Sequence, residues 1–186
     1  MPRIDVIQPE DAEGRLKEIY DEIERSRGKV AEVHKIQSLN PETITNHMDL
    51  YMSVMFGKSP LKRYQREMMA VVVSRANECT YCQRHHLEAL EHFWKEPGRA
   101  EALRQNHREA DLSPVDRALC DYAWQLTTDP GAAEHTDPTE ALRAAELSDR
   151  AILDATLVVS YFNFVNRMVI GLGVELERDP GGYKYE

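Results

Sequence analysis

Residues 59–90 read SPLKRYQREMMAVVVSRANECTYCQRHHLEAL, and this stretch decides the fold. The run 62–76 has the length and the flanking residues of a helix, although its three consecutive valines alone would also fit a strand. A break around residues 77–79 follows, and a second helix then runs toward Pro97-Gly98. The sequence therefore predicts a helix, a break and a helix, with two cysteines where the second helix starts.

The rest of the chain also carries helical patterns between proline, glycine and aspartate boundaries. Helices are expected from residue 9 to Gly28, from Pro41 to Gly57, from Pro114 to Asp129, briefly after Pro138, and from Asp149 to about Gly171. We therefore expect an all-α protein with a single domain over residues 1–186. Within it, 1–57 holds N-terminal helices, 58–96 the redox motif segment, and 97–186 the C-terminal helices and a polar tail.

Composition and charge narrow the class of protein. With 186 residues, 42% of them hydrophobic and a net charge of −9, the chain can build a core but lacks the basic surface that nucleic acid or anionic lipid requires. The N-terminal residues do not resemble a secretory signal, which predicts a cytoplasmic protein. The apolar stretch 151–174 is interrupted by Asp154, Asn163, Asn166 and Arg167, so we expect a core or subunit-interface helix in a homo-oligomer and no membrane span. The two asparagines and the arginine need polar partners if they are buried there.

The two cysteines of the redox motif have a spacing with chemical meaning. Cys79 and Cys82 stand three residues apart at a helix start, which brings them within disulfide range and favours thiolate over thiol. His86 follows Cys82 by one helical turn on the same face, where it can relay a proton. Glu67 lies on the preceding helix, which can bring its carboxylate back beside the imidazole and the thiols. These four residues are the candidate catalytic set.

The intervals of twelve, three and four between Glu67, Cys79, Cys82 and His86 resemble the AhpD-like motif of the carboxymuconolactone decarboxylase superfamily. The stretch 59–90 is similar to the subgroup of uncharacterised peroxidase-related proteins. The resemblance implies an all-helical, commonly oligomeric AhpD-like bundle. It also implies that Cys82 attacks a hydroperoxide, that Cys79 closes the disulfide and transfers protons, and that Glu67 and His86 form the proton relay. Characterised members have a histidine where this chain has Tyr81.

The resemblance also bears on partners and cofactors. It implies an external dithiol reductant, such as a lipoyl domain in characterised relatives, and no bound organic cofactor. Tyr81 and His85 are possible secondary site residues. Two alternatives remain open: the same pair serves as a dithiol-disulfide oxidoreductase or redox sensor without fast peroxidase turnover, or it binds a metal in a protein that is not a catalyst. The metal alternative lacks a second C-x-x-C, so we expect no metal site.

Overall fold

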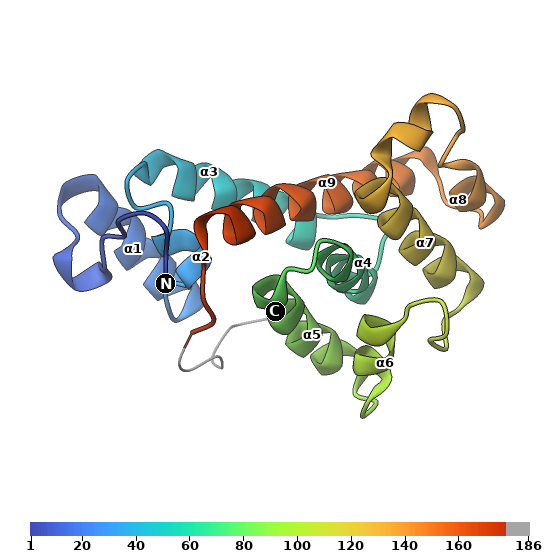
Figure 1. The fold of residues 1–186 in the computed structure, drawn as a ribbon, viewed down its shortest axis with the longest axis horizontal. Coiled ribbons are helices and arrows are strands. Elements are labelled where there is room, and N and C mark those ends of the chain that lie inside the picture. Colours follow the sequence, from blue (N-terminus) through green and yellow to red (C-terminus); the bar gives the residue numbers. More distant parts are fainter. Residues whose placement is uncertain (178–186) are drawn as a thin grey trace. The chain divides into compact units, whose positions relative to one another are not determined.

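The computed structural model describes residues 1–177, and this part of the chain is helical without any strand (Figure 1). The elements in chain order are η1 (Pro9–Asp11), α1 (Gly14–Arg27), α2 (Glu32–Lys35), α3 (Pro41–Tyr51), η2 (Met52–Phe56), α4 (Arg63–Ala76), α5 (Thr80–Trp94), α6 (Arg99–Gln105), α7 (Pro114–Thr128), η3 (Pro130–Glu134), α8 (Glu140–Ala144) and α9 (Asp149–Leu172). The all-α prediction and the helix-break-helix around the cysteines are confirmed. The expected polar tail falls on 178–186, outside the described residues.

The helix ends follow local chemistry. Gly28 ends α1 in the left-handed conformation, with φ of 90° and its N–H bonded to the Glu24 carbonyl. Ser113 caps α7 by accepting a hydrogen bond from the Asp116 N–H at 3.2 Å. The helix expected between Pro41 and Gly57 is divided, because α3 passes into a π-helical turn, η2.

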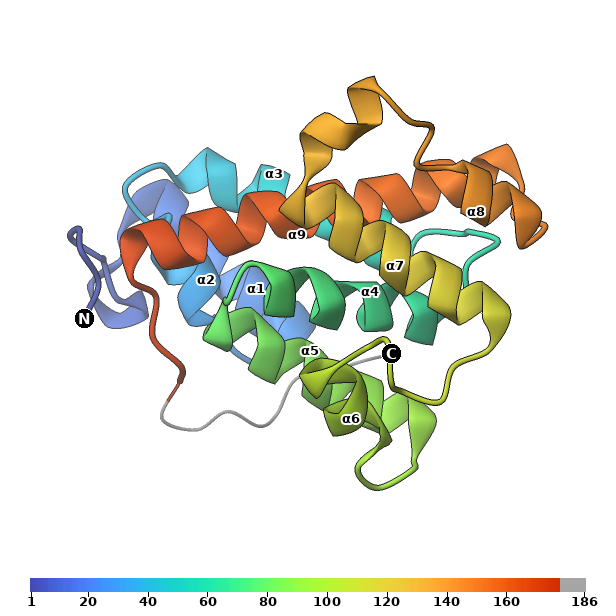
Figure 2. The same ribbon diagram turned by 45° about the vertical axis from the view of Figure 1, so that its right-hand side comes forward.

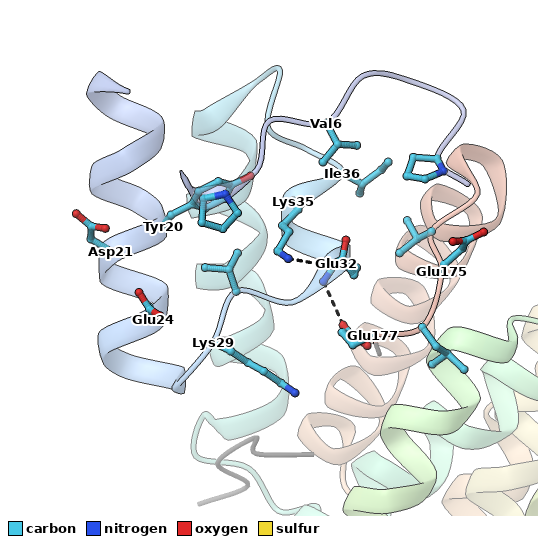
Figure 3. A pocket seen from close by; sticks show the side chains of 15 residues that line it. Val6, Tyr20, Asp21, Glu24, Lys29, Glu32, Lys35, Ile36, Glu175 and Glu177 are labelled. Atoms are coloured by element: carbon cyan, nitrogen blue, oxygen red, sulfur yellow. Dashed lines mark hydrogen bonds and ion pairs between the residues drawn. The ribbon is translucent and has the colours of Figure 1, made fainter. Parts of the chain in front are cut away.

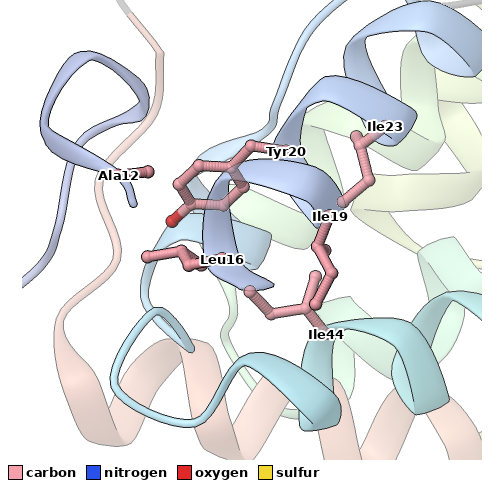
Figure 4. Packing of buried hydrophobic residues seen from close by; sticks show 6 residues of the cluster. All are labelled: Ala12, Leu16, Ile19, Tyr20, Ile23 and Ile44. Carbon is pink, nitrogen blue, oxygen red and sulfur yellow. The ribbon is translucent and has the colours of Figure 1, made fainter. Parts of the chain in front are cut away.

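The chain forms two compact units: Met1–Met52 with the chain from Met168 onward, and Ser53–Arg167. The first unit has its own apolar core, in which α1 packs on α3 (Figure 4). The contacting side chains come from one stripe of α1, spaced three and four residues apart, and from the facing helix. They are Leu16, Ile19, Tyr20 and Ile23, together with Ala12 and Ile44.

The core of the second unit is built around α4, which contacts α5, α6 and α7 (Figures 1 and 2). Ten consecutive residues, Gln65–Ser74, are buried, so α4 has no solvent face. Its polar members have partners: Gln65 donates to Asp116 at 2.7 Å, and Arg66 donates to the Met55 carbonyl at 2.8 Å. Burial on all sides explains why the valine run in the sequence lacked helical periodicity.

Helix α9 is apolar over much of its length. Among the described helices it alone is long and apolar enough to cross a membrane by length and composition, with 44% of that window buried; the core helix of a water-soluble protein passes the same test. Within the second unit, Leu153, Leu157 and Phe164 share one exposed face, at 53%, 42% and 51% exposure. This face is the kind of surface that a subunit contact covers.

The third cysteine of the chain, Cys120, falls off the apolar stripe of its helix, and this pattern predicts a place at a flank or an interface. In the structure it is fully buried within the second unit. Burial raises the pKa of its thiol well above the usual value, so this cysteine is an inert core residue.

Candidate active site

The turn between α4 and α5 fixes the first cysteine. Glu78 adopts a left-handed conformation with φ of 58°, which reverses the chain after α4. The Cys79 N–H then bonds to the Ser74 carbonyl at 2.9 Å, and Cys79 becomes the N-cap of α5. Its sulfur thus lies at the positive end of the α5 dipole, where a thiolate is stabilised.

The two motif cysteines form a reduced, hydrogen-bonded pair. Both are free thiols, and both residues are buried. The pKa of Cys79 is lowered because the Cys82 thiol donates to its sulfur, with further donation from the backbone N–H groups of Cys82 and Tyr81. The pKa of Cys82 is raised well above its usual range, because it is the donor of that bond and is deeply buried. Cys79 is therefore the more acidic sulfur of the pair.

Glu67 is a fully buried carboxylate that lies between Arg63 and His86. One of its oxygens lies 2.5 Å from Arg63 Nη1, and the other lies 2.6 Å from His86 Nδ1. Burial alone would raise the pKa of Glu67, but the charges and hydrogen bonds of His86 and Arg63 outweigh it and lower the pKa. An ionised Glu67 accepts the Nδ1 proton, which leaves His86 Nε2 available for proton exchange.

Arg63 also belongs to this candidate site, although it was not among the residues predicted from the sequence. Its guanidinium packs over the Phe56 ring at 4.2 Å and lies 5.6 Å from the Phe93 ring centroid. The signal was present, because Arg63 precedes Glu67 by four residues and so shares its helix face. A basic residue at that spacing from a candidate catalytic carboxylate is a reason to add it to the site.

Helix α9 closes the site from a distant part of the sequence. The Phe162 ring packs edge-on against His86, with the ring centroids 4.4 Å apart. One turn later on α9, Asn166 is fully buried and its side chain hydrogen bonds to Cys82. Asn166 was interpreted from the sequence only as a polar residue that would need partners in an apolar helix. One of those partners is a cysteine of the redox pair.

The two secondary candidates lie next to the pair. Tyr81 is buried, with its ring 4.5 Å from the ring of His85. Its backbone N–H is one of the groups that lower the pKa of Cys79. The structure thus brings Glu67, His86 and the two cysteines into one neighbourhood, with Tyr81 and His85 along the same helix.

Two cavities can be compared with the positions of the candidate site residues. One, of about 540 Å³, lies in the first unit, where Lys35 pairs with Glu32 and Glu177 accepts from the Glu32 N–H; it contains none of the candidate site residues (Figure 3). The other, of about 390 Å³, borders the redox turn. It is lined by Arg75, Glu78, Thr80, Gln83, Arg104 and Gln105. Within residues 1–177, no three His, Cys, Asp or Glu side chains gather as a metal site.

Comparisons with known proteins agree with this fold. The model of the carboxymuconolactone decarboxylase family matches residues 41–123. An uncharacterised peroxidase-related protein with an AhpD core from Ralstonia eutropha JMP134 superposes with a TM-score of 0.84 at 24% identity, covering 95% of this chain and 93% of that one. An uncharacterised peroxidase-related protein from Silicibacter sp. TM1040 gives a TM-score of 0.82 at 28% identity, covering 100% and 98%.

One curated relative matches most of this chain but is a longer protein. Mouse Sestrin-3 is 24% identical over 187 residues, which covers 97% of this chain but only 36% of that protein. The chain therefore spans about a third of the length of the curated relative that it matches. The matched family model, the shared fold and the motif at the α4–α5 turn together support the assignment of this chain to the AhpD-like and carboxymuconolactone decarboxylase superfamily.

Proposed function

We propose that the protein is a thiol-dependent peroxidase that reduces hydroperoxides through a Cys79–Cys82 disulfide cycle. The observation that carries the proposal is the reduced cysteine pair, which shares one hydrogen bond at the N-terminus of α5. Such a pair holds one thiolate at neutral pH and a second thiol within reach for disulfide closure. The peroxidase-related names of the similar solved structures support the same reaction class.

The first step is a proton transfer within the pair. Cys79 is the more acidic sulfur of the pair, and when it is ionised it accepts the Cys82 S–H. When the proton moves to Cys79, Cys82 becomes the thiolate, with Asn166 as its hydrogen-bond partner. This step reconciles the greater acidity of Cys79 with the role of Cys82 as the attacking sulfur, which the family resemblance implies.

The following steps balance in atoms and electrons. The Cys82 thiolate attacks one peroxide oxygen, the O–O bond breaks, and the alcohol leaves after taking a proton, while Cys82 becomes a sulfenic acid. Cys79 then attacks the sulfenic sulfur, a disulfide forms, and water leaves. An external dithiol reduces that disulfide and is itself oxidised to a disulfide. Two protons and two electrons thus pass from the dithiol to the peroxide.

Glu67, His86 and Arg63 serve as the proton relay and its support. Glu67 holds His86 Nδ1 at 2.6 Å, so His86 Nε2 can return protons to the pair. Arg63 keeps Glu67 ionised. We place the approach of peroxide and reductant at the cavity beside the redox turn, because it is lined by Thr80 and Gln83, the neighbours of the two cysteines.

The primary test is dithiol-dependent consumption of an organic hydroperoxide by the purified protein. The Cys82→Ser variant is the direct comparison. Cys120→Ala is the matched control, because Cys120 is buried and its charged neighbours, Asp116, Asp121 and Arg117, are not site residues. Turnover that is lost in Cys82→Ser and kept in Cys120→Ala supports the proposal. Equal background in all three proteins refutes peroxidase activity. In that case, fast oxidation of the pair by disulfides would favour the oxidoreductase or sensor function.

A second test assigns the roles of the two cysteines. Cys79→Ser is expected to stop disulfide closure and to leave a sulfenic acid on Cys82, which a dimedone label traps. Cys82→Ser is expected to give no such label on Cys79. The reverse pattern would make Cys79 the attacking sulfur. Elemental analysis accompanies both, because stoichiometric zinc that is lost with either substitution would favour the metal-binding alternative.

A further inference from the structure

The side-chain amides between α4 and α9 form a chain with one direction. Asn77 Nδ2 lies 3.0 Å from Asn163 Oδ1 and 3.1 Å from Asn166 Oδ1. The Asn166 amide nitrogen lies 3.3 Å from Ser74 Oγ. Hydrogen bonding by the same side chain acts to lower the pKa of Cys82, against the larger effects that raise it. Exchanging oxygen and nitrogen in any one amide would place two donors or two acceptors against each other.

The direction of this chain is set at its far end by groups with only one possible role. Arg167 is an obligate donor, and its Nη1 lies 2.6 Å from Asn163 Oδ1. The Val159 carbonyl is an obligate acceptor, and it lies 3.0 Å from Asn163 Nδ2. Asn163 therefore presents oxygen to Asn77, so Asn77 presents its amide nitrogen to both neighbours. Asn166 must then turn its oxygen to Asn77 and its N–H groups toward Ser74 and Cys82.

The positions of the helices independently place Asn166 beside this cysteine. Phe162 on α9 packs on His86 of α5, with ring centroids 4.4 Å apart. Asn166 lies one turn after Phe162, and Cys82 lies one turn before His86, so an antiparallel pairing of the two helices brings them together. Asn166 is also fully buried, which makes a misdirected amide group costly.

We propose that Asn166 is the hydrogen-bond donor that stabilises the Cys82 thiolate, and that Arg167, acting through Asn163 and Asn77, is the positioning residue that keeps it a donor. Asn166 touches the reacting sulfur and belongs to the catalytic set. The proposal rests on the peroxidase function only in one respect: that function gives the reason why a stabilised Cys82 thiolate is useful. The hydrogen bond itself can be tested without any peroxide.

The experiment measures the acidity of Cys82 by itself. In a Cys79→Ser, Cys120→Ala background, Cys82 is the only cysteine of the chain. Its rate of alkylation by iodoacetamide is followed against pH by peptide mass spectrometry. The charged and titratable groups near the pair, which are Glu67 and Arg63 on α4, His86 on α5 and Arg167 on α9, stay in place in the parent protein. Peroxide turnover is measured separately, so a failure of the peroxidase proposal does not affect this result.

Asn166→Ala is expected to raise the midpoint of the alkylation profile by about one pH unit, which makes alkylation below the midpoint about tenfold slower. Asn166→Asp, which turns an acceptor and a charge toward the sulfur, is expected to slow it further. Ser160→Ala, at an exposed position of α9, is the matched control and should leave the profile unchanged. An unchanged midpoint in folded Asn166→Ala protein overturns the proposal.

Arg167→Met tests the positioning role at an exposed residue, and it decides the question if the buried variants fail to fold. We expect a slower Cys82 alkylation that persists at about 1 M salt, where the Debye length of about 3 Å removes the field of a surface charge. Arg167→Lys, which keeps a donor, should restore most of the rate. A shift that disappears in high salt, or no shift at all, would show that the direction of the amide chain does not depend on Arg167.

Discussion

The Glu67→Gln substitution tests how much the buried charge cluster contributes to stability. Glu67 is 1% exposed and accepts two charge-assisted contacts, from Arg63 at 2.5 Å and from His86 at 2.6 Å. Glutamine keeps the shape and one acceptor, but it turns an amide N–H₂ toward one of the two donors. The loss of one charge-assisted bond and the new donor–donor contact cost about 2–4 kcal/mol of the free energy of unfolding. For a chain of this size, that corresponds to a melting temperature lower by about 4–16 °C.

The pH dependence of the same variant supplies an independent check. The pKa of Glu67 is lowered in the folded protein from its ordinary value of 4.5. Its contribution to stability is therefore complete above pH 4.5 and is lost as the pH falls through the lower, folded-state value. The difference in unfolding free energy between the native protein and Glu67→Gln should accordingly narrow in acid. Urea denaturation at a series of pH values measures it.

The matched control is Glu91→Gln, which removes a glutamate from an exposed position of α5. Surface substitutions of this kind change stability by less than about 0.5 kcal/mol. A Glu67→Gln protein as stable as the control at neutral pH would refute the charge-cluster reasoning. A stability difference that stays constant in acid would refute the ionised state assigned to Glu67.

Three further predictions follow from the same structure. Arg63→Met should raise the pKa of Glu67 toward its ordinary value of 4.5. The free energy of unfolding should then fall by less below pH 4.5 than in the native protein, as measured by urea denaturation at neutral and acid pH. Glu78→Gly, at φ of 58°, should change the unfolding free energy by between zero and about +1 kcal/mol by calorimetry, because relief of the left-handed strain exceeds the entropy that glycine adds to the unfolded chain; a clear loss would contradict it. Leu157→Glu should lower the mass measured by light scattering, if the exposed apolar face of α9 is a contact between copies of the chain, whereas an unchanged mass would argue against this.

The local geometry of the candidate site could be predicted from the sequence, because its spacings act within one or two helical turns. The three-residue interval between the cysteines and the four-residue interval to His86 each became one turn of α5. Helical periodicity did not single out Glu67, because its neighbours on α4 gave no amphipathic pattern. The structure shows why: α4 is buried on all sides, and its polar residues are distinguished by their partners and not by a solvent face.

The residues that the sequence did not predict act over longer distances or through the backbone. Asn166 reaches Cys82 across 84 positions of the chain, and no local pattern connects the two. The acidity of Cys79 depends on backbone N–H groups and on a turn formed at Glu78, a residue type with no special preference for the left-handed conformation. Asn77 would have been the more natural choice for that conformation.

The same consideration separates the presence of the motif from its chemistry. The C-x-x-C and its helix start determine that two thiols meet, but the neighbours decide which sulfur is charged and how easily the charge moves. In this protein those neighbours include Arg63, which keeps Glu67 ionised, and Asn166, which favours charge on Cys82. Arg63 and Asn166 lie at different distances from the motif in the sequence. Either can therefore change while the C-x-x-C stays intact. Substitution at Arg63 or Asn166 is therefore expected to change the reactivity of the cysteine pair more than it affects the formation of the pair.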